Sequence, residues 1–239
     1  MSTPPSKNAT KSAVAAASAS SVFMVWLLLG FASGACIAVF VLPAWLPGLG
    51  TSLLGPEPKA YWYLSRAAGL VSYVLLWLSM VLGLWITNKL ARVWPGGPTV
   101  FDLHQFASLL SLGFTLFHAL ILLGDPFMDF MWLQVAVPFT NSNYRPFAVG
   151  LGQIGFYASA IVGFSFYVRS MLGHRRWRLI HFLSYATFLL ALGHGLLSGT
   201  DSGVAWIRAM YWATGGSVLF LTFYRLLVRL QAPIRTQPV

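Results

Sequence analysis

The sequence predicts an all-α integral membrane protein: a bundle of six transmembrane helices, both termini cytoplasmic. Of its 239 residues, 57% are hydrophobic and only 8% are charged, whereas soluble domains carry about 25% charged residues. Six apolar segments each approach or exceed the roughly 20 residues that a helix needs to cross a bilayer. Helices are expected because backbone polar groups in lipid must be paired within their own segment. The net charge of +10 comes from basic residues in short connections, so it does not indicate nucleic-acid binding.

The chain divides into a tail, a membrane domain and a second short tail. Residues 1–21 are rich in Ser, Ala and Lys and are predicted to be disordered. Residues 22–230 form the membrane domain, and residues 231–239 form a short cytoplasmic tail. The six predicted spans are, in order, Val22–Trp45, Ala67–Thr87, Phe101–Gly124, Val149–Val168, Arg178–Ser198 and Gly203–Leu227.

The basic residues predict the orientation of these spans. With the N-terminus inside, 11 of the 15 Lys and Arg residues fall on the cytoplasmic side, as is typical of membrane proteins. The four on the other side are Lys59, Arg66, Arg145 and Arg208. The longest external segment, Asp125–Ala148, has an apolar part too short to span. It is expected to lie along the interface or to dip over the outer helix ends.

Four histidines stand within two of the predicted spans. His104 and His118 lie 14 residues apart on the third span, about 21 Å along the axis and about 40° around it. His181 and His194 lie 13 residues apart on the fifth span, which runs in the same direction. His104 and His181 are therefore expected at one depth near the cytoplasm, and His118 and His194 at another near the outside.

The spacing on the fifth span carries one geometric difficulty. Thirteen residues leave His181 and His194 about 140° apart on an ideal helix. That helix is therefore expected to tilt, to bend or to lie tangentially, with Gly193 and Gly195 permitting local distortion and close approach.

Depth-matched imidazole pairs indicate metal ligation. Histidine inside a membrane is costly unless it is paired or functional, and two imidazoles are a common axial ligand set for haem iron. We therefore expect two b-type haems, an inner one on His104 and His181 and an outer one on His118 and His194. Zinc is disfavoured because no Cys, Asp or Glu lies at a suitable spacing. A haem-free protein with structural or proton-conducting histidines stays open, because intramembrane histidines also bridge helices.

Arg66 and His174 lie near the ends of predicted spans, and a role is predicted for each. Arg66 lies at the start of the second span, on the side that basic residues usually avoid, and is a candidate partner for an outer haem propionate. His174, in the sequence GHRRWR between the fourth and fifth spans, is interpreted as a solvated loop residue.

This pattern resembles the ferric reductase-like transmembrane domain, the haem-bearing core shared by ferric reductases and NADPH oxidases. H-x13-H on the third span and H-x12-H on the fifth match its bis-histidine pattern, and Arg66 looks like the arginine that the family places beside the outer haem. The resemblance covers roughly residues 60–230 and is nearest to stand-alone bacterial members, which implies a multi-pass protein of a bacterial cell membrane.

The resemblance also implies a function. A transmembrane b-type cytochrome of this kind passes electrons through two haems to an external acceptor, with ferric iron the named expectation. No flavin or nicotinamide module is visible in the sequence, so FAD or FMN is expected only in a partner, and the donor is a separate flavoprotein or a quinol. The first alternative is a haem-binding subunit that feeds a periplasmic reductase such as methionine sulfoxide reductase.

Overall fold

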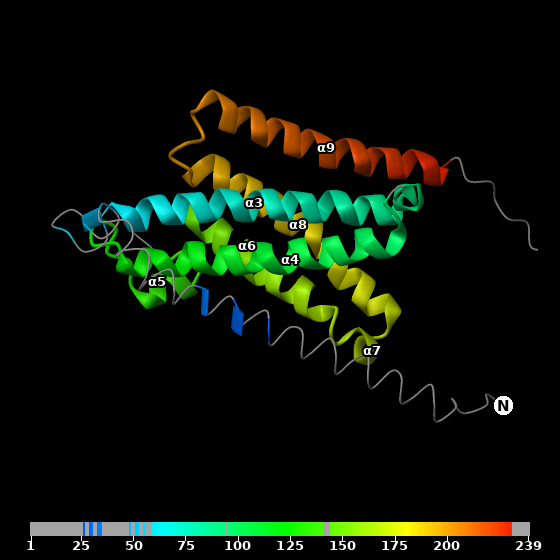
Figure 1. Ribbon diagram of the computed structural model, residues 1–239, viewed down its shortest axis with the longest axis horizontal. Coiled ribbons are helices and arrows are strands. Elements are labelled where there is room, and N and C mark those ends of the chain that lie inside the picture. The colour runs from blue at the N-terminus through cyan, green and yellow to red at the C-terminus, as the bar shows by residue number, and fades with distance from the viewer. Residues whose placement is uncertain are drawn as a thin grey trace, which may run out of the picture. The chain divides into compact units, whose positions relative to one another are not determined.

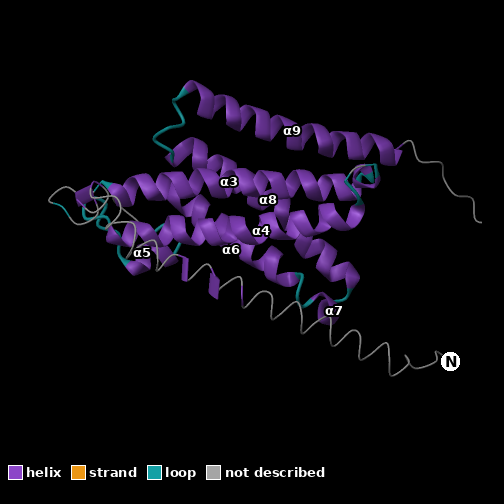
Figure 2. Ribbon diagram, in the orientation of Figure 1, coloured by secondary structure: helices purple, strands orange, loops and turns teal. Residues whose placement is uncertain are grey.

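The computed structural model describes residues 59–230, except residues 94 and 141–143, together with a few positions before residue 59. All regular secondary structure in this part of the chain is helical (Figure 2). The predicted first span, Val22–Trp45, lies almost wholly outside the described residues, as do the tails at 1–21 and 231–239.

Long helices confirm the second to the fifth predicted spans as helices. The long helices of the described part are α3 (Ala60–Thr87), α4 (Gly97–Leu120), α6 (Pro146–Ser165), α8 (His174–Ser198) and α9 (Ala205–Leu230). Shorter elements connect them: η1 (Leu90–Arg92), η2 (Ile121–Gly124), α5 (Trp132–Ala136) and α7 (Arg169–Leu172). Among the described residues, α3, α4 with η2, α6 and α8 are long and apolar enough to cross a membrane. Helix α9 covers the predicted sixth span but is not among these candidate membrane helices, so six spans stay a prediction.

Two helix starts differ from the prediction. Helix α3 begins at Ala60 rather than Ala67, which places Arg66 inside the helix. Helix α8 begins at His174 rather than Arg178, so the prediction of a loop residue at His174 is wrong, although its side chain is exposed. Gly173, with φ of 75°, separates α7 from α8 in a left-handed conformation that favours glycine.

Helices α3 and α4 run side by side and meet along a polar seam (Figure 1). At its middle the Ser72 hydroxyl donates to the Ser111 carbonyl, and the Ser111 hydroxyl donates back to the Ser72 carbonyl, both at 2.9 Å. Residues seven apart on each helix make the three contacts of the seam: Ser65 with His118, Ser72 with Ser111, and Ser79 with His104. A seven-residue repeat keeps one face of a helix against its neighbour, so this seam holds α3 and α4 in register.

The other helices pack around this seam. Helix α9 lies along α3, where the hydroxyl groups of Tyr73 and Thr214 are 2.6 Å apart and Trp77 Nε1 donates to Ser217 Oγ at 2.8 Å. Helix α6 approaches α8 closely at Gly155, where an added Cβ would lie 3.3 Å from Leu190 Cβ. Small residues at such crossings are typical of membrane bundles.

Large apolar side chains cover the outward faces of the long helices. Val71 and Leu78 on α3, Leu103 and Phe106 on α4, and Ile161 on α6 are all exposed. Exposed apolar surface on this scale is unfavourable in water and suits lipid. This surface and the four long apolar helices are consistent with a multi-pass membrane protein.

Candidate functional site

Helices α4 and α8 bring the four histidines together in two facing pairs. The ring centroids of His104 and His181 are 6.2 Å apart with an interplanar angle of 73°. The ring centroids of His118 and His194 are 6.0 Å apart with an angle of 77°. The pairing expected from depth is thus present in the structure, and α8 is an unbroken helix through both of its histidines.

The separation within each pair fits one metal ion between two imidazoles. A metal–imidazole bond of about 2 Å, and about 1.1 Å more from that nitrogen to the ring centre, place two opposed rings about 6.2 Å apart. Nearly perpendicular ring planes are compatible with this arrangement because both planes can contain the shared axis. Among the described residues no group of three or more His, Cys, Asp or Glu side chains could hold a metal ion, so a metal between two imidazoles would need further ligands from outside the protein.

Three of the four imidazoles are held by a backbone carbonyl of a neighbouring helix. His118 Nδ1 lies 2.7 Å from Ser65 O, His104 Nδ1 lies 2.8 Å from Ser79 O, and His194 Nδ1 lies 2.8 Å from Ala148 O. A carbonyl only accepts, so Nδ1 carries the proton in each ring and donates it. This tautomer leaves Nε2 with its lone pair available for a metal, which is the usual role of such bonds behind histidine ligands.

A glycine lies one turn beyond each of these carbonyls and makes room for the ring. An added Cβ at Gly69 would lie 3.0 Å from His118 Nδ1, at Gly83 it would lie 3.3 Å from His104 Cε1, and at Gly152 it would lie 2.6 Å from His194 Nδ1. On α3 the arrangement occurs twice as Ser-x-x-x-Gly, at 65–69 and 79–83, with the same 14-residue offset that separates His104 from His118.

His181 is held differently from the other three histidines. In the part of the chain that the structure describes, neither of its ring nitrogens makes a hydrogen bond. Its ring stacks on Trp177, one turn earlier on α8, with centroids 5.2 Å apart and planes 29° from parallel.

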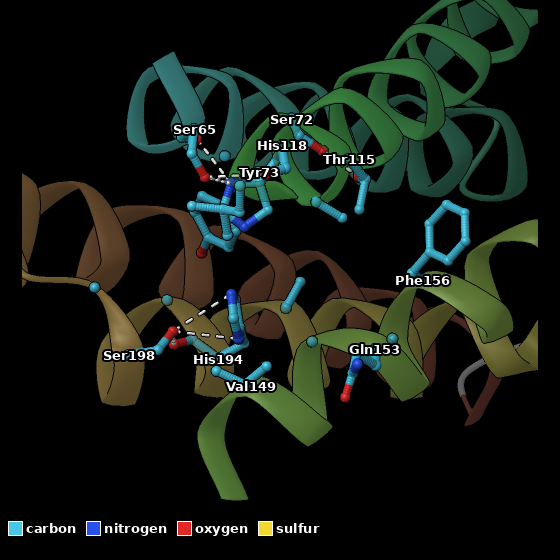
Figure 3. A pocket seen from close by; sticks show the side chains of 18 of the residues that line it. Ser65, Ser72, Tyr73, Thr115, His118, Val149, Gln153, Phe156, His194 and Ser198 are labelled. Atoms are coloured by element: carbon cyan, nitrogen blue, oxygen red, sulfur yellow. Dashed lines mark hydrogen bonds between the residues drawn. The ribbon is translucent and has the colours of Figure 1, made fainter. Parts of the chain in front are cut away.

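The His118/His194 pair opens onto a cavity of about 360 Å³, within the usual size range of ligand sites. Figure 3 shows the two rings facing each other, with Ser65 beside His118 and Ser198 beside His194. The Ser198 hydroxyl donates to the carbonyl of His194 at 2.6 Å. Phe130, Trp132 and Gln134, from the segment before α6, contribute to the wall of this cavity. Whether residues 125–148 lie along the interface or dip over the helix ends stays a prediction.

Arg66 lines the same cavity but already has an acidic partner. Its Nε donates to Asp201 Oδ2 at 2.8 Å, and its Nη2 bonds to Asp201 Oδ1. Asp201 lies in the connection from α8 to α9, and both side chains are about one quarter to one third exposed. Sequence reasoning missed Asp201, which has no motif around it. The role of Arg66 toward a haem propionate stays a prediction.

Two buried polar atoms lie without a partner beside the histidine pairs. Among the described residues these are Trp177 Nε1, next to His181, and Gln153 Oε1, in the cavity wall near His194. Buried polar groups are nearly always hydrogen-bonded, so each indicates a missing partner such as a bound group or water. Trp177 Nε1 is a donor, which suits a carboxylate such as a haem propionate. The donor set, the ring spacing and these atoms fit haem at both pairs.

No family model, curated protein or solved structure matches the chain. The interpretation of the site therefore depends on its own geometry.

Proposed function

We propose that this protein is a transmembrane b-type cytochrome that carries electrons between a donor and an acceptor on opposite sides of the membrane through two bis-histidine haems. The observation that carries the proposal is the repetition of one arrangement at two depths. The same two helices, α4 and α8, provide both facing pairs, with ring separations of 6.2 and 6.0 Å. Histidines that only bridge helices have no reason to keep this separation twice.

Some residues would bind the haems, and others orient the residues that bind them. Nε2 of His104 and His181 would hold one haem, and Nε2 of His118 and His194 the other. The carbonyls of Ser65, Ser79 and Ala148 orient three of these rings. A bis-histidine haem supplies a one-electron Fe(III)/Fe(II) change with little rearrangement.

The donor and the acceptor follow from the resemblance to ferric reductase-like membrane domains. We propose a separate flavoprotein or a quinol as the electron donor, and ferric iron outside the cell membrane as the acceptor. The cavity beside His118 and His194 supports an acceptor on that side, because Arg66 and Asp201 give its apolar wall one charged edge. The same feature supports the alternative acceptor, a periplasmic reductase that docks there.

The test is a haem count on the detergent-purified chain. Pyridine haemochrome quantitation and a reduced-minus-oxidised spectrum are expected to give about two b-type haems per chain. A chain that binds no haem when expressed with ample haem would overturn the proposal and favour structural histidines. With two haems present, re-oxidation of the reduced protein by ferric citrate tests the acceptor.

A further inference from the structure

The four histidines differ in how firmly the neighbouring helices hold them. His104, His118 and His194 each donate a hydrogen bond of 2.7 to 2.8 Å to a carbonyl on α3 or α6. His181 makes no such bond among the described residues, and Trp177, its stacking partner, belongs to the same helix. No neighbouring helix therefore fixes the direction of the His181 Nε2.

Helix α6 supports His194 but gives His181 no corresponding contact. Helix α6 serves His194 with the carbonyl of Ala148 and the gap at Gly152. Because α6 and α8 run in opposite directions there, the α6 residues opposite His181 are 13 or 14 positions later, near residue 162. The carbonyl of Val162 accepts the Ser165 hydroxyl at 2.7 Å, and an added Cβ at Gly163 would meet nothing within 4 Å. At this level α6 offers His181 no hydrogen bond among the described residues, and the helix ends at Ser165.

From this contrast we infer that His181 is a displaceable ligand, so that the His104/His181 site takes a small neutral ligand such as CO while the His118/His194 site does not. The inference rests on the proposed haem function. In the exchange, His181 Nε2 would leave the iron and CO would take its position through the carbon lone pair, so the iron would stay Fe(II). His104 keeps its place because Ser79 O holds its ring.

Trp177 governs how easily His181 leaves. The stacked indole is the contact that opposes rotation of the His181 ring. Aromatic pairs of this kind contribute modestly beyond their buried area, so removing the indole is expected to speed ligand exchange about 2- to 10-fold. Trp177→Phe keeps a stacking ring and is the matched control for Trp177→Leu.

The experiment adds CO to the dithionite-reduced, detergent-purified holoprotein and follows the haem absorbance. In the wild type, about half of the haem is expected to bind CO. Two double variants assign the site. His118→Ala/His194→Ala keeps the His104/His181 pair and is expected to bind CO, whereas His104→Ala/His181→Ala keeps the other pair and is expected to bind none. Faster binding in Trp177→Leu than in Trp177→Phe completes the expected result.

The possible failures are distinguishable. Two haems per chain that both ignore CO, or that both bind it alike, would overturn the inference about His181 and leave the cytochrome proposal standing. CO binding confined to the His118/His194 pair would overturn it too. Absence of haem from the wild type would overturn both proposals.

Discussion

The two histidine pairs come from the same two helices, yet they differ in how many of their rings are bonded to a carbonyl of a neighbouring helix. In the His118/His194 pair, α3 and α6 each place a backbone carbonyl against an imidazole ring. In the His104/His181 pair only α3 does so. The ring separations are nearly equal in the two pairs, so the carbonyl from α6 is not needed to set the distance between the rings. The comparison teaches that two rings can be held at one distance while only one of the pairs has both of its rings fixed in orientation.

The largest expected effect is the loss of one haem from a single substitution. His194→Ala removes one of the two proposed ligands of the His118/His194 pair, and an alanine supplies no nitrogen in its place. We expect this variant to lose about one of two haems while part of the His104/His181 signal persists. Pyridine haemochrome quantitation measures the loss. Full retention of both haems would contradict the ligand assignment.

The carbonyl behind His194 is tested through the glycine that gives the ring its room. In Gly152→Ala the new Cβ would lie 2.6 Å from His194 Nδ1, so the ring must move away from the Ala148 carbonyl. Partners behind histidine ligands typically change metal affinity about 10- to 100-fold, and we expect a loss of haem affinity on that scale. Haem titration of the apoprotein measures it.

The matched control for that variant is on the same helix. In Gly163→Ala the added Cβ meets nothing within 4 Å, so haem affinity is expected to be unchanged. Equal losses in the two variants would show that α6 tolerates no larger residue in general, and that the Ala148 carbonyl has no special role.

Much of the fold was predictable from hydropathy, because α3, α4, α6 and α8 are apolar over lengths that only a membrane helix requires. The pairing of the histidines followed from their spacing and from the parallel direction of their spans. The 13-residue spacing puts His181 and His194 about 140° apart on an ideal helix, but this did not prevent the pairing. Figure 1 shows α8 running obliquely to α4, and both of its histidines still face that helix. Tilt, which was one of the expected solutions, requires no break at Gly193 or Gly195.

The contacts that hold the histidine rings were only partly accessible to sequence reasoning. A backbone carbonyl has no residue signature, so Ala148 could not be recognised as a partner of His194. The glycines did leave a signal: Ser-x-x-x-Gly recurs on α3 at the same 14-residue interval as the two histidines of α4. Matching intervals on successive antiparallel spans indicate residues that meet at two depths, and this comparison was available from the sequence.

A smaller effect is expected at the ion pair that borders the cavity. Arg66→Gln leaves Asp201 without its partner in a partly exposed position. The expected cost lies between that of exposed and buried pairs, about 1 to 2 kcal/mol of unfolding free energy. Thermal unfolding in detergent measures it, and the double variant Arg66→Gln/Asp201→Asn is expected to recover part of the loss. Measured beside the single variant Asp201→Asn, a loss in the double variant equal to the sum of the two single losses would show that the contact contributes nothing.

The smallest expected effect separates the carbonyl of Ser65 from its hydroxyl. The hydroxyl donates to the His118 carbonyl at 3.0 Å, whereas the ring nitrogen of His118 bonds to the Ser65 carbonyl, which remains in Ser65→Ala. Hydrogen bonds between membrane helices average about 0.6 kcal/mol, so Ser65→Ala should cost little stability and no haem. Gly69→Ala is the informative partner, because its Cβ would lie 3.0 Å from His118 Nδ1 and presses on the ring itself. Haem loss in Ser65→Ala equal to that in Gly69→Ala would assign the orientation of His118 to the hydroxyl. Loss in Gly69→Ala alone would assign it to the backbone, and would explain how a site of this kind can tolerate side-chain changes behind its ligands.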